Sequence, residues 1–103
     1  MVSTPLSKTM KIPKQIKIGG KLVNVMLVSG EEHFPDDESG MSFLKQNIIK
    51  IDNQMNIDEQ SSTLLHEIIE FINEMYELKL NHKTITCLET SLYQVLHDNK
   101  LKF

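Results

Sequence analysis

The chain has 103 residues, 40% of them hydrophobic, and a formal net charge of −3 at pH 7. This length and composition allow one modest hydrophobic core, so we expect a single domain and exclude a large enzyme with separate substrate domains. No run of residues approaches the roughly 18 to 20 apolar positions that a membrane helix needs, and the first residues lack the apolar stretch of a signal peptide. We therefore expect a cytoplasmic protein without membrane contact.

Charge is unevenly distributed along the chain. Five of the eleven lysines come before residue 22, whereas the segment 51–78 has seven acidic residues and no lysine. Arginine is absent, so no guanidinium group is present to recognise phosphate or guanine in a bidentate manner. The acidic segment favours a cation or a basic partner over the backbone of a nucleic acid. We therefore expect a protein or peptide partner and no nucleic-acid binding.

The first half of the chain predicts a small sheet. Residues 1–10 are polar and contain a proline, so we expect a flexible lead-in before a single domain at 11–103. Two β-branched runs on either side of a Gly-Gly pair predict a β-hairpin over about 12–28. The segment 29–41 contains two glycines, a proline and five acids, which is typical of a surface loop. The β-branched run at 46–52 predicts a third strand.

The second half predicts two helices. The first is expected at about 58–77, with Asn56 or Asp58 as its N-cap, apolar residues on one broad face and polar residues on the other. The second is expected from residue 82 or 83 to residue 98. The whole pattern predicts an α+β fold in which two packed helices cover one face of a three-stranded, mostly antiparallel sheet. The apolar face of the first helix is too wide for the sheet alone, so the second helix or a second subunit of a homo-oligomer should cover the rest.

The polar face of the first helix carries the sequence His66-Glu67-Ile68-Ile69-Glu70. His66 and Glu70 are four residues apart, so their side chains project from the same face one turn apart and can bind one ion. In helix-borne zinc peptidase sites, the residue after the first histidine is a glutamate that accepts the proton of a zinc-bound water. This pattern predicts a zinc site with Glu67 as the general base. The alternative is an ordinary solvated face, but such faces usually mix carboxylates with lysines.

The second helix supplies two further candidate metal ligands. Glu89 falls on the edge of the apolar stripe of this helix, where an unpaired carboxylate is costly. It therefore requires a metal, a base or a hydrogen-bond donor. His82, two turns earlier, lies on nearly the same side and is expected either to serve as a substitute or fourth ligand or simply to begin the helix.

A strand at 47–52 that follows a hairpin and precedes the helix motif Thr63-Leu64-Leu65-His66-Glu67 resembles the minimal zincin core of small phage and bacterial metallopeptidase-like proteins. The segment 88–99 also resembles the last helix of such phage proteins. The resemblance covers roughly residues 11–99, and the helix motif is its specific part. It implies a zinc-dependent peptidase-like hydrolase in a bacterial host cell.

This resemblance assigns roles to individual residues. His66 matches the first zinc histidine and Glu67 the general base of His-Glu-x-x-His enzymes. Glu89 follows His66 by 23 residues, which is similar to the distance at which gluzincins place their glutamate ligand. Glu70 departs from the pattern, because the family has its second histidine there, and this puts turnover in more doubt than metal binding. The alternative is a non-catalytic phage accessory or host-modulating protein that binds a protein through its acidic helix face.

Overall fold

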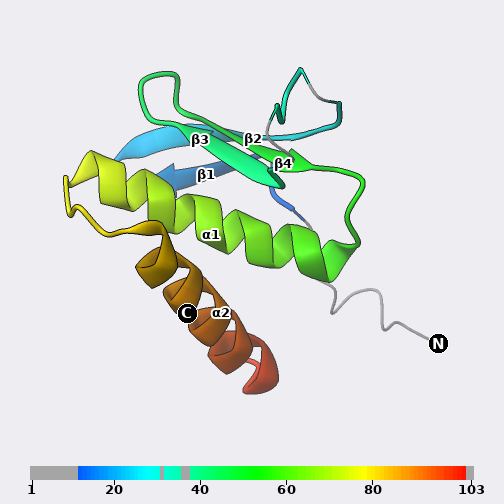
Figure 1. Ribbon diagram of the computed structural model, residues 1–103, viewed down its shortest axis with the longest axis vertical. Coiled ribbons are helices and arrows are strands. Elements are labelled where there is room, and N and C mark those ends of the chain that lie inside the picture. Colours follow the sequence, from blue (N-terminus) through cyan, green and yellow to red (C-terminus); the bar gives the residue numbers. More distant parts are fainter. Residues whose placement is uncertain (1–11, 31, 36–37, 102–103) are drawn as a thin grey trace.

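The computed structural model describes residues 12–30, 32–35 and 38–101. Its elements are, in chain order, β1 (Gln15–Ile18), β2 (Lys21–Val28), β3 (Gly40–Phe43), β4 (Ile48–Asp52), α1 (Ile57–Met75) and α2 (His82–Asp98). The sheet lies on one side of α1, and α2 lies on the other (Figure 1). The α+β fold predicted from the sequence is confirmed, with one strand more than expected. The lead-in predicted at 1–10 lies outside the described residues.

The four strands form a mixed sheet in the order β1-β2-β4-β3. The two outer pairs, β1 with β2 and β3 with β4, are antiparallel, and the first of these pairs is the expected hairpin. The central pair, β2 with β4, is parallel, which the prediction of a three-stranded sheet did not include. Strand β3 therefore occupies one edge of the sheet.

The prediction of a loop over 29–41 was wrong at its end, because β3 begins at Gly40. This strand is short, starts with glycine and contains no β-branched residue, so it has no local strand signal. Its conformation is set by pairing with β4, which places Gly40 opposite Ile51 and Phe43 opposite Ile48. Tertiary pairing therefore determines this strand.

The predicted hairpin is confirmed, and its turn contacts α1. Gly19 and Gly20 have φ angles of 59° and 100°, which glycine adopts without the steric penalty of a side chain. A Cβ atom on Gly19 would lie 2.7 Å from the Cε atom of Met75, at the end of α1. The backbone conformation of the turn therefore favours glycine, and a larger residue at Gly19 would also have to displace the end of the Met75 side chain.

Both helices begin at asparagine caps. The side chain of Asn56 accepts a hydrogen bond from the backbone N–H of Glu59, and the Glu59 carboxylate accepts one from the backbone N–H of Asn56, which completes a capping box at the start of α1. The side chain of Asn81 accepts from the N–H of Thr84 at the start of α2. Helix α1 ends slightly before the predicted residue 77, since Glu77 has a φ of 52° and cannot continue it.

The core lies between the inner face of the sheet and α1. Its buried residues are Ile18, Val23, Val25, Ile49, Ile51, Leu64 and Phe71. Glu67 is also buried, with 7% of its surface exposed, although the sequence pattern placed it on the polar face of the helix. It lies three residues after Leu64 and four before Phe71, so it is at the border of the face that packs on the sheet. One carboxylate of the predicted site is therefore inside the domain.

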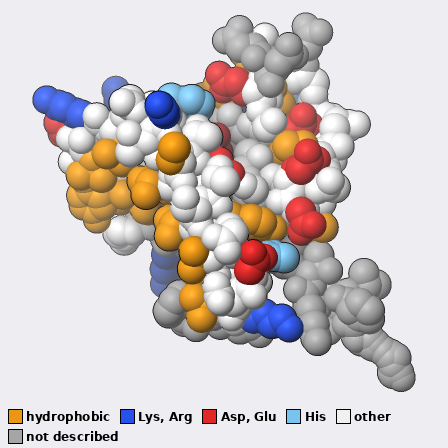
Figure 2. Space-filling view, turned by 60° about the horizontal axis from the view of Figure 1, so that its bottom comes forward, with side chains coloured by type: hydrophobic (Ala, Val, Ile, Leu, Met, Phe, Trp, Pro, Cys, Tyr) orange, Lys and Arg blue, Asp and Glu red, His pale blue; other side chains and the backbone are white. Residues whose placement is uncertain are grey.

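Helix α2 packs on α1 mainly through its first half. Ile85 is its one buried residue, and the whole of this helix is described. Among its other apolar residues, Leu88, Leu92 and Val95 are 40–43% exposed and Leu96 is half-buried, and Figure 2 shows hydrophobic side chains on this face of the molecule. The homo-oligomer considered for the apolar face of the first helix stays a prediction. Among the described residues, no helix is both long and apolar enough to cross a membrane.

The close approach of β3 to α1 predicts that Gly40→Ala destabilises the fold. A Cβ atom on Gly40 would lie 2.7 Å from Cγ2 of Thr63 and 2.9 Å from Cγ of Glu67, so the strand has to shift. We expect a loss of about 1 to 3 kcal/mol in the free energy of unfolding, measured by urea denaturation. Ser39→Ala, at an exposed neighbouring position, is the control and should change little. Equal stability of both variants would contradict this packing.

Candidate metal centre

A cleft of about 570 Å³ opens between β3, α1 and the first half of α2. All five residues predicted to form the site line it: His66, Glu67, Glu70, His82 and Glu89. Three of them come from α1 and two from α2, so the structure brings together residues up to 23 positions apart. The predicted convergence of the two helices on one site is therefore present.

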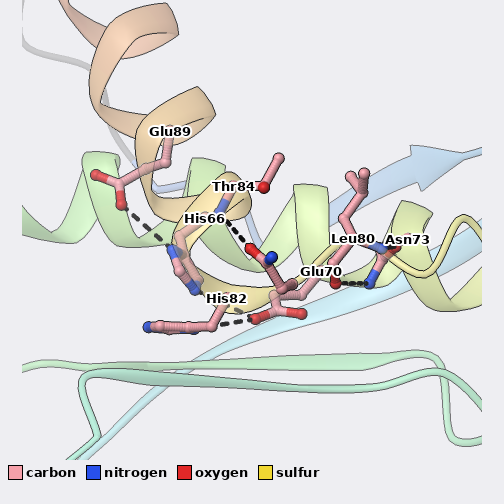
Figure 3. A network of polar contacts seen from close by, with 8 residues as sticks. His66, Glu70, Asn73, Leu80, His82, Thr84 and Glu89 are labelled. Carbon is pink, nitrogen blue, oxygen red and sulfur yellow. Dashed lines mark hydrogen bonds and ion pairs between the residues drawn. The ribbon is translucent and has the colours of Figure 1, made fainter.

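The connection between the helices fixes the position of His82. The backbone N–H of Leu80 donates to Oδ1 of Asn73 at 2.9 Å, and Nδ2 of Asn73 donates to the Leu80 carbonyl at 3.3 Å. The cap at Asn81 then starts α2 directly beside α1. As a result, the first residue of α2 lies next to Glu70, one turn after His66 on α1 (Figure 3).

Three side chains converge as potential ligands of one ion. They are those of His66, Glu70 and His82, and we call them the convergent group. The Nε2 atom of His66 lies 3.4 Å from Oε2 of Glu70, and Nδ1 of His82 lies 3.8 Å from the same oxygen. One ligand atom from each of the three residues lies within 4.8 Å of the others. Ligand atoms at about 2.0 to 2.1 Å from a tetrahedral ion are about 3.3 to 3.4 Å apart. The first distance already matches this geometry, and rotation of the exposed His82 side chain can shorten the others.

Glu89 contacts the other side of the His66 ring. Its Oε1 atom lies 3.3 Å from Nδ1 of His66, and its Oε2 atom accepts a hydrogen bond from the hydroxyl of Ser62. The convergent group thus contains His82, for which only a substitute or fourth-ligand role was predicted. Glu89 lies beside the ring nitrogen of His66 that faces away from Glu70. The ligand role of Glu89 stays a prediction.

Glu67 lies deeper in the cleft than the convergent group. Burial and, to a smaller extent, the negative charges of Glu70 and Glu38 raise the pKa of its carboxyl from 4.5 to about 8, although a hydrogen bond with the Ser42 side chain opposes this shift. Gly40 of β3 lies directly against its side chain. A carboxyl group with a pKa near neutrality can both accept and donate a proton under ordinary conditions, which suits a general base.

Sequence reasoning missed three residues that shape the site. Gly40 and Ser42 form the β3 wall, and they gave no signal because the strand depends on tertiary pairing. Ser62 lies one turn before His66 on α1, and this spacing was the available sign that its hydroxyl shares the same face. The wall and the Ser62 contact both involve elements that are distant in sequence.

Comparison of the chain with protein-family models, with curated proteins and with solved structures found no match. The resemblance to small zincin-like proteins therefore rests on the helix motif and stays a prediction. The geometry of the cleft is the basis on which a function can be proposed.

The raised pKa of Glu67 predicts a pH-dependent stability in the presence of EDTA. The folded state holds the proton up to about pH 8, whereas the unfolded chain releases it near the ordinary value of 4.5. Stability should therefore fall as pH rises between these values, by about 1.4 kcal/mol per pH unit at most. Glu67→Gln, which resembles the protonated form, should gain stability relative to wild type over the same range in urea denaturation.

The exposed Glu74 on α1 provides the control for this measurement. The free energy of unfolding of Glu74→Gln should differ from that of wild type by an amount that does not change between about pH 4.5 and 8. If Glu67→Gln shows the same flat difference, the Glu67 carboxyl does not titrate in a buried environment.

Proposed function

We propose that this protein is a small zinc-dependent hydrolase of the peptidase type, in which His66, Glu70 and His82 hold the ion and Glu67 is the general base. The main support is the convergence of two imidazoles and one carboxylate from two helices, at a cleft that also holds a buried carboxyl group. Two histidines and one glutamate are a common ligand set of catalytic zinc sites, in which a fourth position stays open for water or substrate.

The residues of the cleft fit the division of roles that such a reaction needs. A bound zinc ion supplies Lewis acidity and lowers the pKa of a coordinated water to about 7. Glu67 lines the same cleft as the candidate ligands, so its carboxylate would be placed to accept a proton from a water and to pass it to a leaving amine. The positive charge of the ion favours the ionised form of Glu67 and so prepares it as a base.

The edge strand β3 supports a peptide as the substrate. It pairs with β4 on one side and is the last strand of the sheet, so its other side can offer backbone hydrogen-bonding groups to an extended chain. Residues 39–42 line the same cleft as the candidate ligands. A peptide paired with this edge therefore passes beside Glu67 and the convergent group.

Zinc binding is the first expected result. Protein purified without chelator should contain one equivalent of zinc, and free zinc at about 100 times its Kd should add about 2.7 kcal/mol of stability. For a domain of this size this corresponds to a rise of roughly 10 °C or more in Tm, which EDTA should reverse in a thermal melt. His66→Ala and His82→Ala should each lose the ion and the thermal shift.

His97→Ala serves as the matched control, because His97 is an exposed histidine on α2 outside the cleft. It should keep both the zinc and the shift in Tm. Wild-type protein with neither zinc nor a response to added zinc would exclude the metal centre, and a docking surface formed by the acidic helix face would then be the better explanation.

Hydrolysis should depend on Glu67. Glu67→Gln should keep one equivalent of zinc while the rate of cleavage of a fluorogenic peptide library falls by about 100-fold or more, which is the usual contribution of a general base. Glu74→Gln should cleave at the wild-type rate. Zinc-loaded wild type that cleaves no peptide would instead support a metal-binding protein without turnover.

A further inference from the structure

We infer that Glu89 is a positioning residue, which accepts a hydrogen bond from Nδ1 of His66 and leaves Nε2 of that ring free to bind an ion. This inference rests on the proposed metal centre and replaces the ligand role expected for Glu89 from the sequence. It starts from the position of the His66 ring between two carboxylates: Nδ1 lies 3.3 Å from Glu89 and Nε2 lies 3.4 Å from Glu70 (Figure 3).

The chemistry of imidazole makes these two contacts unequal. A neutral ring carries one N–H, and an ion can bind only the nitrogen without it. His82 converges with Glu70 on the Nε2 side, so this is the side on which three ligand atoms can meet. A proton on Nδ1 of His66 therefore leaves the lone pair of Nε2 directed toward Glu70 and His82.

Glu89 is better suited than Glu70 to hold the N–H. The Glu89 side chain is 17% exposed and the Glu70 side chain is 30% exposed, so solvent screens the charge of Glu89 less. The Ser62 hydroxyl also donates to the second oxygen of Glu89 and fixes the carboxylate plane. Both oxygens of Glu89 thus have partners within the protein, whereas Glu70 faces the two imidazoles.

The hydrogen-bonded series Ser62–Glu89–His66 runs from α1 to α2 and back to α1. Histidines that bind metals usually donate their other N–H to a carboxylate or a carbonyl, which fixes the orientation of the ring and the form in which it binds. In this protein the donor to that carboxylate and the histidine are on the same helix, one turn apart, and the carboxylate comes from the other helix. Docking of α2 therefore orients His66 in addition to bringing His82 to the site.

The tautomer of His66 tests this role without any metal. Nitrogen chemical shifts of the histidine rings, recorded by NMR in EDTA at a pH where the ring is neutral, should show the Nδ1–H form of His66 in wild type. Glu89→Gln keeps the size of the side chain, but its amide can donate as well as accept a hydrogen bond. It therefore no longer requires a proton on Nδ1 of His66, and the Nε2–H form should increase. Glu74→Gln, an exposed glutamate changed in the same way, should match wild type.

Two results overturn the inference: a predominant Nε2–H form in wild type, or a tautomer ratio that Glu89→Gln leaves unchanged. Ser62→Ala should shift the ratio in the same direction by a smaller amount. If far-UV circular dichroism shows that Glu89→Gln does not fold, Ser62→Ala replaces it as the test. A tautomer ratio that Ser62→Ala leaves unchanged then overturns the inference.

The zinc-loaded protein gives a second readout. Glu89→Gln should still bind one equivalent of zinc, with a Kd raised by about 10- to 100-fold in a chelator competition. X-ray absorption should show the same number of nitrogen and oxygen ligands as in wild type, and the loss of an oxygen ligand would overturn the inference, because Glu89 would then bind the ion. If wild type binds no zinc, the proposed function fails, while the tautomer of the metal-free protein still decides the role of Glu89.

Discussion

Helix α1 packs against the sheet on one side and against α2 on the other (Figure 1). The candidate site lies on the narrow strip of polar α1 surface between these two contacts. Leu64 and Phe71 enter the core under the sheet, and Ile85 of α2 packs on the opposite side of the helix. His66 and Glu70 lie between these faces and therefore line the cleft. Strand β3 limits the width of this strip, because Gly40 allows the strand to lie directly on the helix. Any shift of either neighbour changes the site.

The balance of charge in the cleft follows from this confinement. Four carboxylates line it, from Glu38, Glu67, Glu70 and Glu89, and no lysine is among the described residues of its walls. In metal-free protein the repulsion is relieved in part by a proton on Glu67, the most buried of the four. A divalent ion held beside Glu70 would relieve the same repulsion with its positive charge. Proton and ion would then compete to neutralise one cluster, and the affinity for the ion would rise with pH.

Local signals in the sequence predicted the elements that local interactions form. The Gly-Gly turn, the candidate cap at Asn56 and the 3.6-residue period placed the hairpin and both helices within a few residues, because turns and caps depend on neighbouring positions. The spacing of His66 and Glu70 likewise predicted a shared face. Strand β3, the parallel central pair and the burial of Glu67 were missed, since each depends on which segment lies opposite. The orientation of Glu89 toward Nδ1 of His66 is of the same kind: the sequence placed it near the histidine without indicating which nitrogen it meets.

The attachment of α2 connects the fold to the site. Most of its apolar stripe is exposed, so burial of hydrophobic area contributes less to its docking than is usual for a helix of this length. Several of its contacts with α1 are polar and lie in or near the cleft, among them those of Glu89 with Ser62 and His66. If α2 moved away, the site would lose Glu89 and His82 together, whereas His66 and Glu70 would stay on α1. An ion held by ligands from both helices must therefore stabilise their contact by the same free energy that the contact adds to its own binding. In this domain, binding of an ion at the candidate site and docking of α2 would therefore be coupled reciprocally.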